Sequence, residues 1–149
     1  MTVSQGYCHT ASVTFTRILM LTSQNVEDCP DNDSHNVDAI DALMILPPVV
    51  IATMDATPTL RALALKTAIQ VTRDTNAVLR AANIYAEMLI DVLRGTSIPE
   101  AAQAAGLKMN YDVATDVRRN SGRADPMTAC YITSSFPVML FFAYKYGES

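Results

Sequence analysis

The most concentrated chemistry in the sequence is a run of oxygen-bearing side chains at residues 31–35, which read D-N-D-S-H. Alternating oxygen ligands of this kind can bind calcium. A calcium loop of the EF-hand type also needs a sharp-turn glycine and a distant bidentate glutamate, and both are missing. Asp38 and Asp41 follow three residues apart and could face a common cation with Asp33. Acidic residues in a first helical turn also complement the helix dipole, and we favour this interpretation. No metal ligand is therefore assigned.

Nucleophilic catalysis has little support in the sequence. His9 and His35 are the only two histidines, and neither lies in a recognisable nucleophile motif. Cys130 precedes an apolar run with no neighbouring cation or base to generate a thiolate, so it is predicted to be a small buried side chain. No catalytic residue is assigned.

A hydroxyl-rich run, T-S-S at residues 133–135, comes just before the last apolar segment. One interpretation is helix capping. In the other, the hydroxyls and free N–H groups of a helix N-terminus hold a phosphate. Ser134 and Ser135, together with Cys130 just before them, are the candidate substrate-binding residues.

The charge balance argues against one class of partner. The chain has 149 residues, of which 11 are basic and 15 acidic, for a net charge of −4. It lacks the basic surface that nucleic-acid binding requires, so no nucleic-acid partner is expected. Cys8, Cys29 and Cys130 form no C-x-x-C pair, which argues against a disulfide framework and a zinc site and favours reduced thiols in a cytoplasmic protein.

No segment predicts secretion or membrane insertion. The apolar run at residues 18–21 is far shorter than the core of a signal peptide. The longest apolar stretch, residues 136–144, is about half of the length that crosses a bilayer. We therefore expect no membrane partner.

Helical periodicity dominates the sequence after residue 36. Residues 1–24 show one weak alternation, which fits either a strand or an irregular lead-in, and residues 25–36 collect turn-forming Asn, Asp and Pro. We divide the chain into an N-terminal segment with an acidic loop at 1–35 and a helical region at 36–149. Half of the residues are hydrophobic, so one compact core is expected.

Prolines punctuate the first part of the helical region. Pro47-Pro48 should kink or stop a helix whose apolar face carries Val37, Ile40, Leu43 and Met44. Thr57 and Pro58 are typical of a helix start. The apolar stripe predicted for that helix consists of Leu60, Leu63, Ala64, Thr67, Ala68 and Val71, opposite Arg61, Lys66 and Arg73.

Capping signals bound the later helices. The clearest helix has Val78, Ala82, Tyr85, Leu89 and Val92 on one face, with Arg80 among the polar residues opposite, and it ends at Gly95. Ser97 and Glu100 form a capping box that opens an alanine-rich helix stopping at Gly106.

The final helix is predicted to be the most buried element because it is apolar on nearly every side. It should begin at Ser134 or Ser135, accept Pro137 in its first turn and run to Gly147.

Three segments resemble the ADP-ribosylglycohydrolase-like family, which includes the J1-type crystallins. Residues 37–50 are similar to that family's D-A-x-x-x-L helix running into a proline-interrupted helix. Residues 67–93 resemble its pair of helices joined by a V-T-x-D/N turn. Residues 130–137, C-Y-I-T-S-S-F-P, resemble the loop that leads into its late core helix. The resemblance covers the later part of the family's domain only.

The resemblance implies an all-α fold, an orthogonal helical bundle that would be incomplete here. It also implies hydrolysis of glycosidic bonds to ADP-ribose, with ADP-ribose or an ADP-ribosylated substrate as partner and two magnesium ions held by acidic residues. The first 24 residues lack the family's early acidic metal motif, and the chain reaches Ser149 before the late Gly-Gly-Asp motif. We therefore expect a catalytically incomplete fragment or degenerate member that binds no magnesium specifically.

Two other classes of function stay open, a structural protein of the J1-crystallin kind and a non-catalytic helical interaction module. An incomplete bundle should leave large side chains under-covered, and we expect this of Phe136, Phe141, Phe142 and Tyr146. Self-association would follow.

Overall fold

The computed structural model describes residues 38–70, 75–120 and 131–148, and the structural statements below concern these residues. Their regular elements are the 3₁₀ helix η2 (Ile40–Ile45) and the α-helices α2 (Leu46–Thr53), α3 (Pro58–Gln70), α4 (Asn76–Leu93), α5 (Ile98–Leu107), α6 (Val113–Arg119) and α7 (Ile132–Tyr146). The β-pairing among them is one isolated antiparallel bridge between Ala39 and Tyr131. The prediction of an all-α fold is confirmed.

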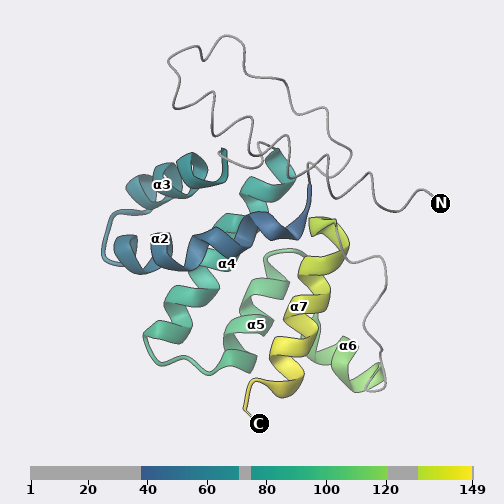
Figure 1. The fold of residues 1–149 in the computed structure, drawn as a ribbon. Coiled ribbons are helices and arrows are strands. Elements are labelled where there is room, and N and C mark those ends of the chain that lie inside the picture. The colour runs from purple at the N-terminus through teal and green to yellow at the C-terminus, as the bar shows by residue number, and fades with distance from the viewer. Residues whose placement is uncertain (1–37, 71–74, 121–130, 149) are drawn as a thin grey trace, which may run out of the picture.

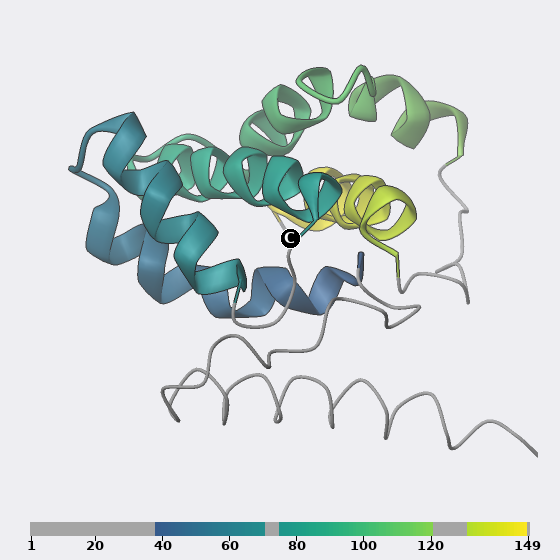
Figure 2. The same ribbon diagram turned by 90° about the horizontal axis from the view of Figure 1, so that it is seen from above.

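Helix α4 is the centre of the packing. Figures 1 and 2 show it between the α2 and α3 pair on one side and α5 and α7 on the other, while α6 packs against α5 and α7. Its buried residues are distributed around much of its circumference and comprise Val78, Ala81, Ala82, Ile84, Ala86, Met88 and Ile90. The predicted apolar face was therefore too narrow, because α4 packs against helices on more than one side.

The chain changes from a 3₁₀ helix to an α-helix next to the two prolines. The 3₁₀ helix η2 ends at Ile45, and Pro47 and Pro48 lie in the first turn of α2, where backbone N–H groups need no intrahelical acceptor. The predicted interruption is thus confirmed. Met44, predicted on the apolar face, is 79% exposed. A 3₁₀ helix has three residues per turn, so the core-facing row is Ile40, Leu43 and Leu46.

Helix α3 begins where predicted but faces another way. The Leu60 N–H donates to the Thr57 hydroxyl at 3.3 Å, which confirms the cap. The buried positions are Leu65 and Ile69, whereas Leu60 and Leu63 are exposed. The predicted stripe was therefore wrong for Leu60, Leu63 and Thr67, whereas Ala68 does pack against the core. Val71 and Arg73 lie outside the described residues.

The half-buried Arg61 explains the orientation of α3. Its guanidinium donates to the backbone carbonyls of Thr53, Met54 and Ala56 at 3.2, 3.0 and 3.1 Å. These carbonyls belong to the end of α2 and the turn that follows it, where a cation is favourable. Arg61 thus turns the face that it shares with Leu65 toward the rest of the bundle, since residues four apart lie on the same side of a helix.

The start of α7 differs from the prediction. The helix begins at Ile132, and its N-cap Tyr131 makes no side-chain cap. The Ile132 N–H donates to the Asp38 carbonyl at 2.6 Å, so the pairing beside Ala39 starts the helix two or three residues earlier than predicted. Pro137 is consequently the sixth residue of α7 and lies inside it rather than in the first turn.

The aromatic residues of α7 are mostly covered. Phe136 and Phe141 have no exposed surface, and Phe142 is partly buried. The Phe136 ring packs edge-on against Tyr85 of α4, with 6.5 Å between the ring centroids. The prediction of under-covered side chains is wrong for Phe136 and Phe141 and correct for Tyr146, which is 52% exposed.

Two loops follow their local signals. Gly95 after α4 has a φ of +100°, as its predicted role at the helix end requires. At the start of α5 the Glu100 N–H donates to the Ser97 hydroxyl at 3.4 Å, and that hydroxyl donates to the Glu100 carboxylate at 2.9 Å. The predicted cap at Ser97 is confirmed.

The sequence reading missed α6. Its N-cap is Asp112, whose carboxylate accepts hydrogen bonds from the Thr115 N–H at 3.1 Å and the Thr115 hydroxyl at 2.7 Å. The Gln103 amide of α5 donates to the same carboxylate at 3.1 Å. These bonds, above all the one from the Thr115 side chain, lower the pKa of Asp112.

The lowered pKa of Asp112 has a measurable consequence for stability. Its contribution should be fully present above its unfolded pKa of about 3.9 and be lost as pH falls through the lower folded value. We expect Asp112→Asn to be less stable than the parent chain at pH 6, with the difference shrinking toward pH 2. Urea unfolding at several pH values measures it. A difference that grows on acidification would contradict this sign.

Candidate functional site

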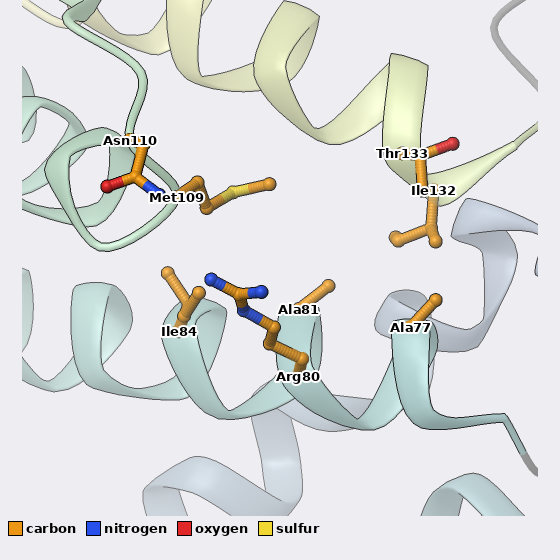
Figure 3. A pocket seen from close by; sticks show the side chains of 8 residues that line it. All are labelled: Ala77, Arg80, Ala81, Ile84, Met109, Asn110, Ile132 and Thr133. Atoms are coloured by element: carbon orange, nitrogen blue, oxygen red, sulfur yellow. The ribbon is translucent and has the colours of Figure 1, made fainter.

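A cavity of about 240 Å³ lies between α4, the loop after α5 and the start of α7 (Figure 3). Four of its lining residues come from α4, at positions 77, 80, 81 and 84. This spacing puts them on one face of the helix. The complete lining is Ala77, Arg80, Ala81, Ile84, Met109, Asn110, Ile132 and Thr133.

The loop after α5 owes its position to tight local bonding. The carbonyl of Gly106 accepts the N–H groups of Met109 at 2.8 Å and Tyr111 at 2.9 Å. Asn110 between them has a φ of 59°, and it is the one non-glycine residue with positive φ in the described ranges. Asparagine tolerates this left-handed conformation better than most residues, which makes it a common helix terminator. The reversal brings the Met109 and Asn110 side chains to the cavity.

The polar side chains at the cavity have hydrogen-bond donors and acceptors that no protein group uses within the described residues. One Arg80 nitrogen donates to the Lys108 carbonyl at 3.3 Å, and no carboxylate pairs with Arg80 among the described residues. The Asn110 amide and the Thr133 hydroxyl likewise have no hydrogen-bond partner within the ranges that the structure covers. Figure 3 shows the Arg80 guanidinium reaching toward Met109 and Asn110, with Ala77 and Ile132 at the other end.

The cavity therefore combines an apolar wall with a cation and an amide. Ala77, Ala81, Ile84 and Ile132 can cover the apolar part of a small ligand. The guanidinium of Arg80 can donate to an anionic group, and the amide of Asn110 can both donate and accept. No carboxylate lines this space, so its lining has no general base for hydrolysis. The arrangement suits binding of a small anion.

The predicted acidic residues have other roles where the structure describes them. The Asp38 carboxylate accepts a hydrogen bond from the hydroxyl of Thr75, the N-cap of α4, and the Asp38 backbone carbonyl accepts one from the Ile132 N–H of α7. Asp41 is exposed in η2. In the ranges covered here, no group of three or more His, Cys, Asp or Glu side chains is arranged to hold a metal ion. Asp31, Asp33 and both histidines lie outside the described residues.

The structure places two of the three candidate substrate-binding residues. The Ser134 and Ser135 hydroxyls both donate to the Tyr131 carbonyl, at 3.0 and 2.7 Å, and neither residue lines the cavity. They thus bond backward along the chain instead of capping α7. Cys130 lies outside the described residues. Thr133, from the same run, is at the cavity.

Sequence reasoning missed Arg80 and Asn110. Arg80 belongs to the predicted polar face of α4, where a solvent-exposed arginine is ordinary. The one available signal was Asn110 a few residues after the predicted helix stop, a position that favours left-handed residues. Nothing local indicated that these residues would meet across a cavity.

No helix in the described ranges combines the length and the apolar character needed to cross a membrane. The sequence and the fold matched no known protein family, curated protein or solved structure.

Proposed function

We propose that this chain is a non-catalytic helical domain of the ADP-ribosylglycohydrolase type that binds a small anionic ligand in the cavity beside Arg80. ADP-ribose is the ligand that the sequence resemblance suggests, and its pyrophosphate is the group that the guanidinium would bind. The observation that carries the proposal is the juxtaposition, at one cavity with an apolar wall, of an exposed arginine without a carboxylate partner and an exposed asparagine amide without a protein hydrogen bond, as far as the structure describes them.

The size of the cavity limits what it can enclose. A volume of about 240 Å³ is below the range of about 300–1,000 Å³ typical of sites for drug-sized ligands. The cavity would therefore hold the part of ADP-ribose near its phosphates, and the rest of the ligand would extend outside. Such partial enclosure favours modest affinity.

Replacing the cation tests the proposal. Arg80→Met keeps the aliphatic stem and removes a charge-assisted hydrogen bond worth about 1.5–3 kcal/mol. We expect the dissociation constant for ADP-ribose to rise about 10- to 100-fold, measured by isothermal titration calorimetry. Arg118→Met on α6 is the matched control, since it removes the same charge from an exposed residue that does not line the cavity.

The same titration separates binding from catalysis. We expect magnesium or a chelator to leave the affinity unchanged and the ligand to be recovered intact, because the cavity lining offers no acidic metal ligand. Equal affinity of the Arg80→Met variant and the parent, or no binding by either, would contradict the proposal. Release of ADP-ribose from modified protein that a chelator abolishes would assign the ligands to Asp31, Asp33, Asp38 and Asp41.

A second candidate function is a helical interaction module. Met44, Ile51, Leu60 and Leu63 on η2, α2 and α3 are 79, 59, 55 and 60% exposed, which favours contact with another protein. A structural role of the J1-crystallin kind would instead require a stable monomer at high concentration. Light scattering as a function of concentration distinguishes the two.

A further inference from the structure

Arg80 lies between two acidic residues along α4. On the N-terminal side, the Asp38 carboxylate accepts a hydrogen bond from the hydroxyl of Thr75, the N-cap of α4, which is five residues before Arg80. On the other side, Glu87 follows Arg80 by seven residues. Because α4 rises about 1.5 Å per residue, Thr75 and Glu87 are about 8 and 10 Å from Arg80 along the helix axis. These separations are close to the Debye length of about 10 Å at 0.1 M salt, so both acids influence an anion at Arg80.

Glu87 is on the side of α4 that carries Arg80. Seven residues make almost two full helical turns, and Glu87 is three residues beyond the lining residue Ile84. Its carboxylate pairs with the Lys108 ammonium at 2.5 Å, and both side chains are about half exposed. Lys108 directly precedes the lining residue Met109 (Figure 3). The ammonium near the cavity is therefore neutralised by Glu87 and adds no net charge there.

The cavity thus offers one positive charge to a ligand. Arg80 has no carboxylate partner among the described residues, and its guanidinium can balance one negative charge. A second negative charge on the same ligand group would lack a counter-ion beside the apolar wall. Desolvating an unpaired charge is costly, and the carboxylates of Asp38 and Glu87 would repel it.

We propose that the cavity selects anionic groups with a single negative charge and that Glu87 sets this selectivity by neutralising Lys108. The inference rests on the proposed anion site at Arg80 and does not require ADP-ribose as its ligand. Carboxylates, phosphodiesters and each phosphate of a pyrophosphate diester belong to this class. A terminal phosphate ester, which carries about 1.5 to 2 negative charges at pH 7, is disfavoured.

Two small anions of similar shape test the selectivity. Methanesulfonate and sulfate are both tetrahedral and carry one and two negative charges at pH 7. Each is titrated into the full chain at constant ionic strength, with the NMR signals of the Arg80 Nε–H group and the Met109 methyl group as readouts. We expect the parent chain to bind methanesulfonate about threefold more tightly than sulfate. Tighter binding of sulfate would overturn the proposal.

Glu87→Gln removes the charge that neutralises Lys108. Because the Coulomb energy is proportional to the charge of the ligand, the fold-change for sulfate should be the square of that for methanesulfonate. We expect gains of about threefold for methanesulfonate and about ninefold for sulfate, so that the two anions bind about equally. Adding Lys108→Met should restore the parent preference. Equal fold-changes for the two anions, or no change, would overturn the role of Glu87.

Asp55→Asn is the matched control for Glu87→Gln. It also removes one carboxylate from an exposed ion pair, since Asp55 lies 3.7 Å from Arg94. Arg94 is fourteen residues from Arg80, or about 21 Å along α4, which is well beyond the Debye length. We expect this variant to leave both anion affinities unchanged. Gains as large as those of Glu87→Gln would mean that net charge alone determines binding, and they would overturn the proposal.

A parallel titration with ADP-ribose separates this inference from the proposed function. Selective anion binding that responds to Glu87→Gln, without binding of ADP-ribose, would contradict only the proposed function. Binding of ADP-ribose with an anion preference that Glu87→Gln leaves unchanged would overturn only this inference. Signals of Arg80 and Met109 that respond to neither small anion would overturn the inference whether or not ADP-ribose binds.

Discussion

Phe136→Ala is expected to lower the free energy of unfolding by about 3–5 kcal/mol, a large part of the roughly 5–15 kcal/mol that stabilises a typical domain. Phe136 has no exposed surface and belongs to the core shared by α4, α5 and α7. Truncation removes the apolar area that it buries and its edge-on contact with Tyr85, and it leaves a cavity that the surrounding helices can fill only in part.

Urea unfolding followed by circular dichroism measures this effect. Tyr146→Ala is the matched control, because it truncates another aromatic side chain of α7 that is 52% exposed. We expect it to cost less than about 1 kcal/mol. Similar losses for both variants would mean that Phe136 is not part of a close-packed core. That outcome would restore the expectation of an under-covered α7.

The features that the sequence predicted correctly depend on short-range chemistry. Three of them involve only groups within a few residues of one another: the cap at Thr57, the glycine at position 95 and the cap at Ser97. These features can therefore be predicted without knowing how distant parts of the chain pack. The change from a 3₁₀ helix to an α-helix beside Pro47 and Pro48 is equally local.

The wrong predictions share a different cause, which is contact between distant parts of the chain. Arg61 turns α3 by donating to carbonyls at the end of α2, and Asp38 starts α7 early by accepting the N–H of Ile132. Periodicity assumes an α-helix with a single buried side, and η2 has a different period. The cavity is the extreme case, because Arg80, Asn110 and Thr133 come from three separate elements.

Gly106 combines a short-range role that the sequence predicted with a packing contact that the sequence did not predict. The sequence predicted it as the end of a helix, and α5 does end at the next residue, Leu107. The structure adds a second role, since Gly106 is buried where the chain passes close to α5 on its way to α6. A Cβ atom there would overlap the Val113 side chain and would lie 2.6 Å from the Tyr111 carbonyl oxygen.

We therefore expect Gly106→Ala to destabilise the domain by about 3 kcal/mol, at the upper end of the usual cost of overpacking. At an open helical position the same change would stabilise by up to about 1 kcal/mol, so the sign of the effect is diagnostic. The Tyr111 carbonyl cannot easily move away, because the Tyr111 N–H donates to the Gly106 carbonyl at 2.9 Å.

Adding Val113→Ala to Gly106→Ala should recover only part of the lost stability, since it removes the side-chain overlap and leaves the backbone contact. Thermal and urea unfolding of the two single variants and the double variant measure the coupling. Net stabilisation by Gly106→Ala would show that the loop after α5 approaches the helix less closely, and it would also weaken the case for the cavity that Met109 and Asn110 line.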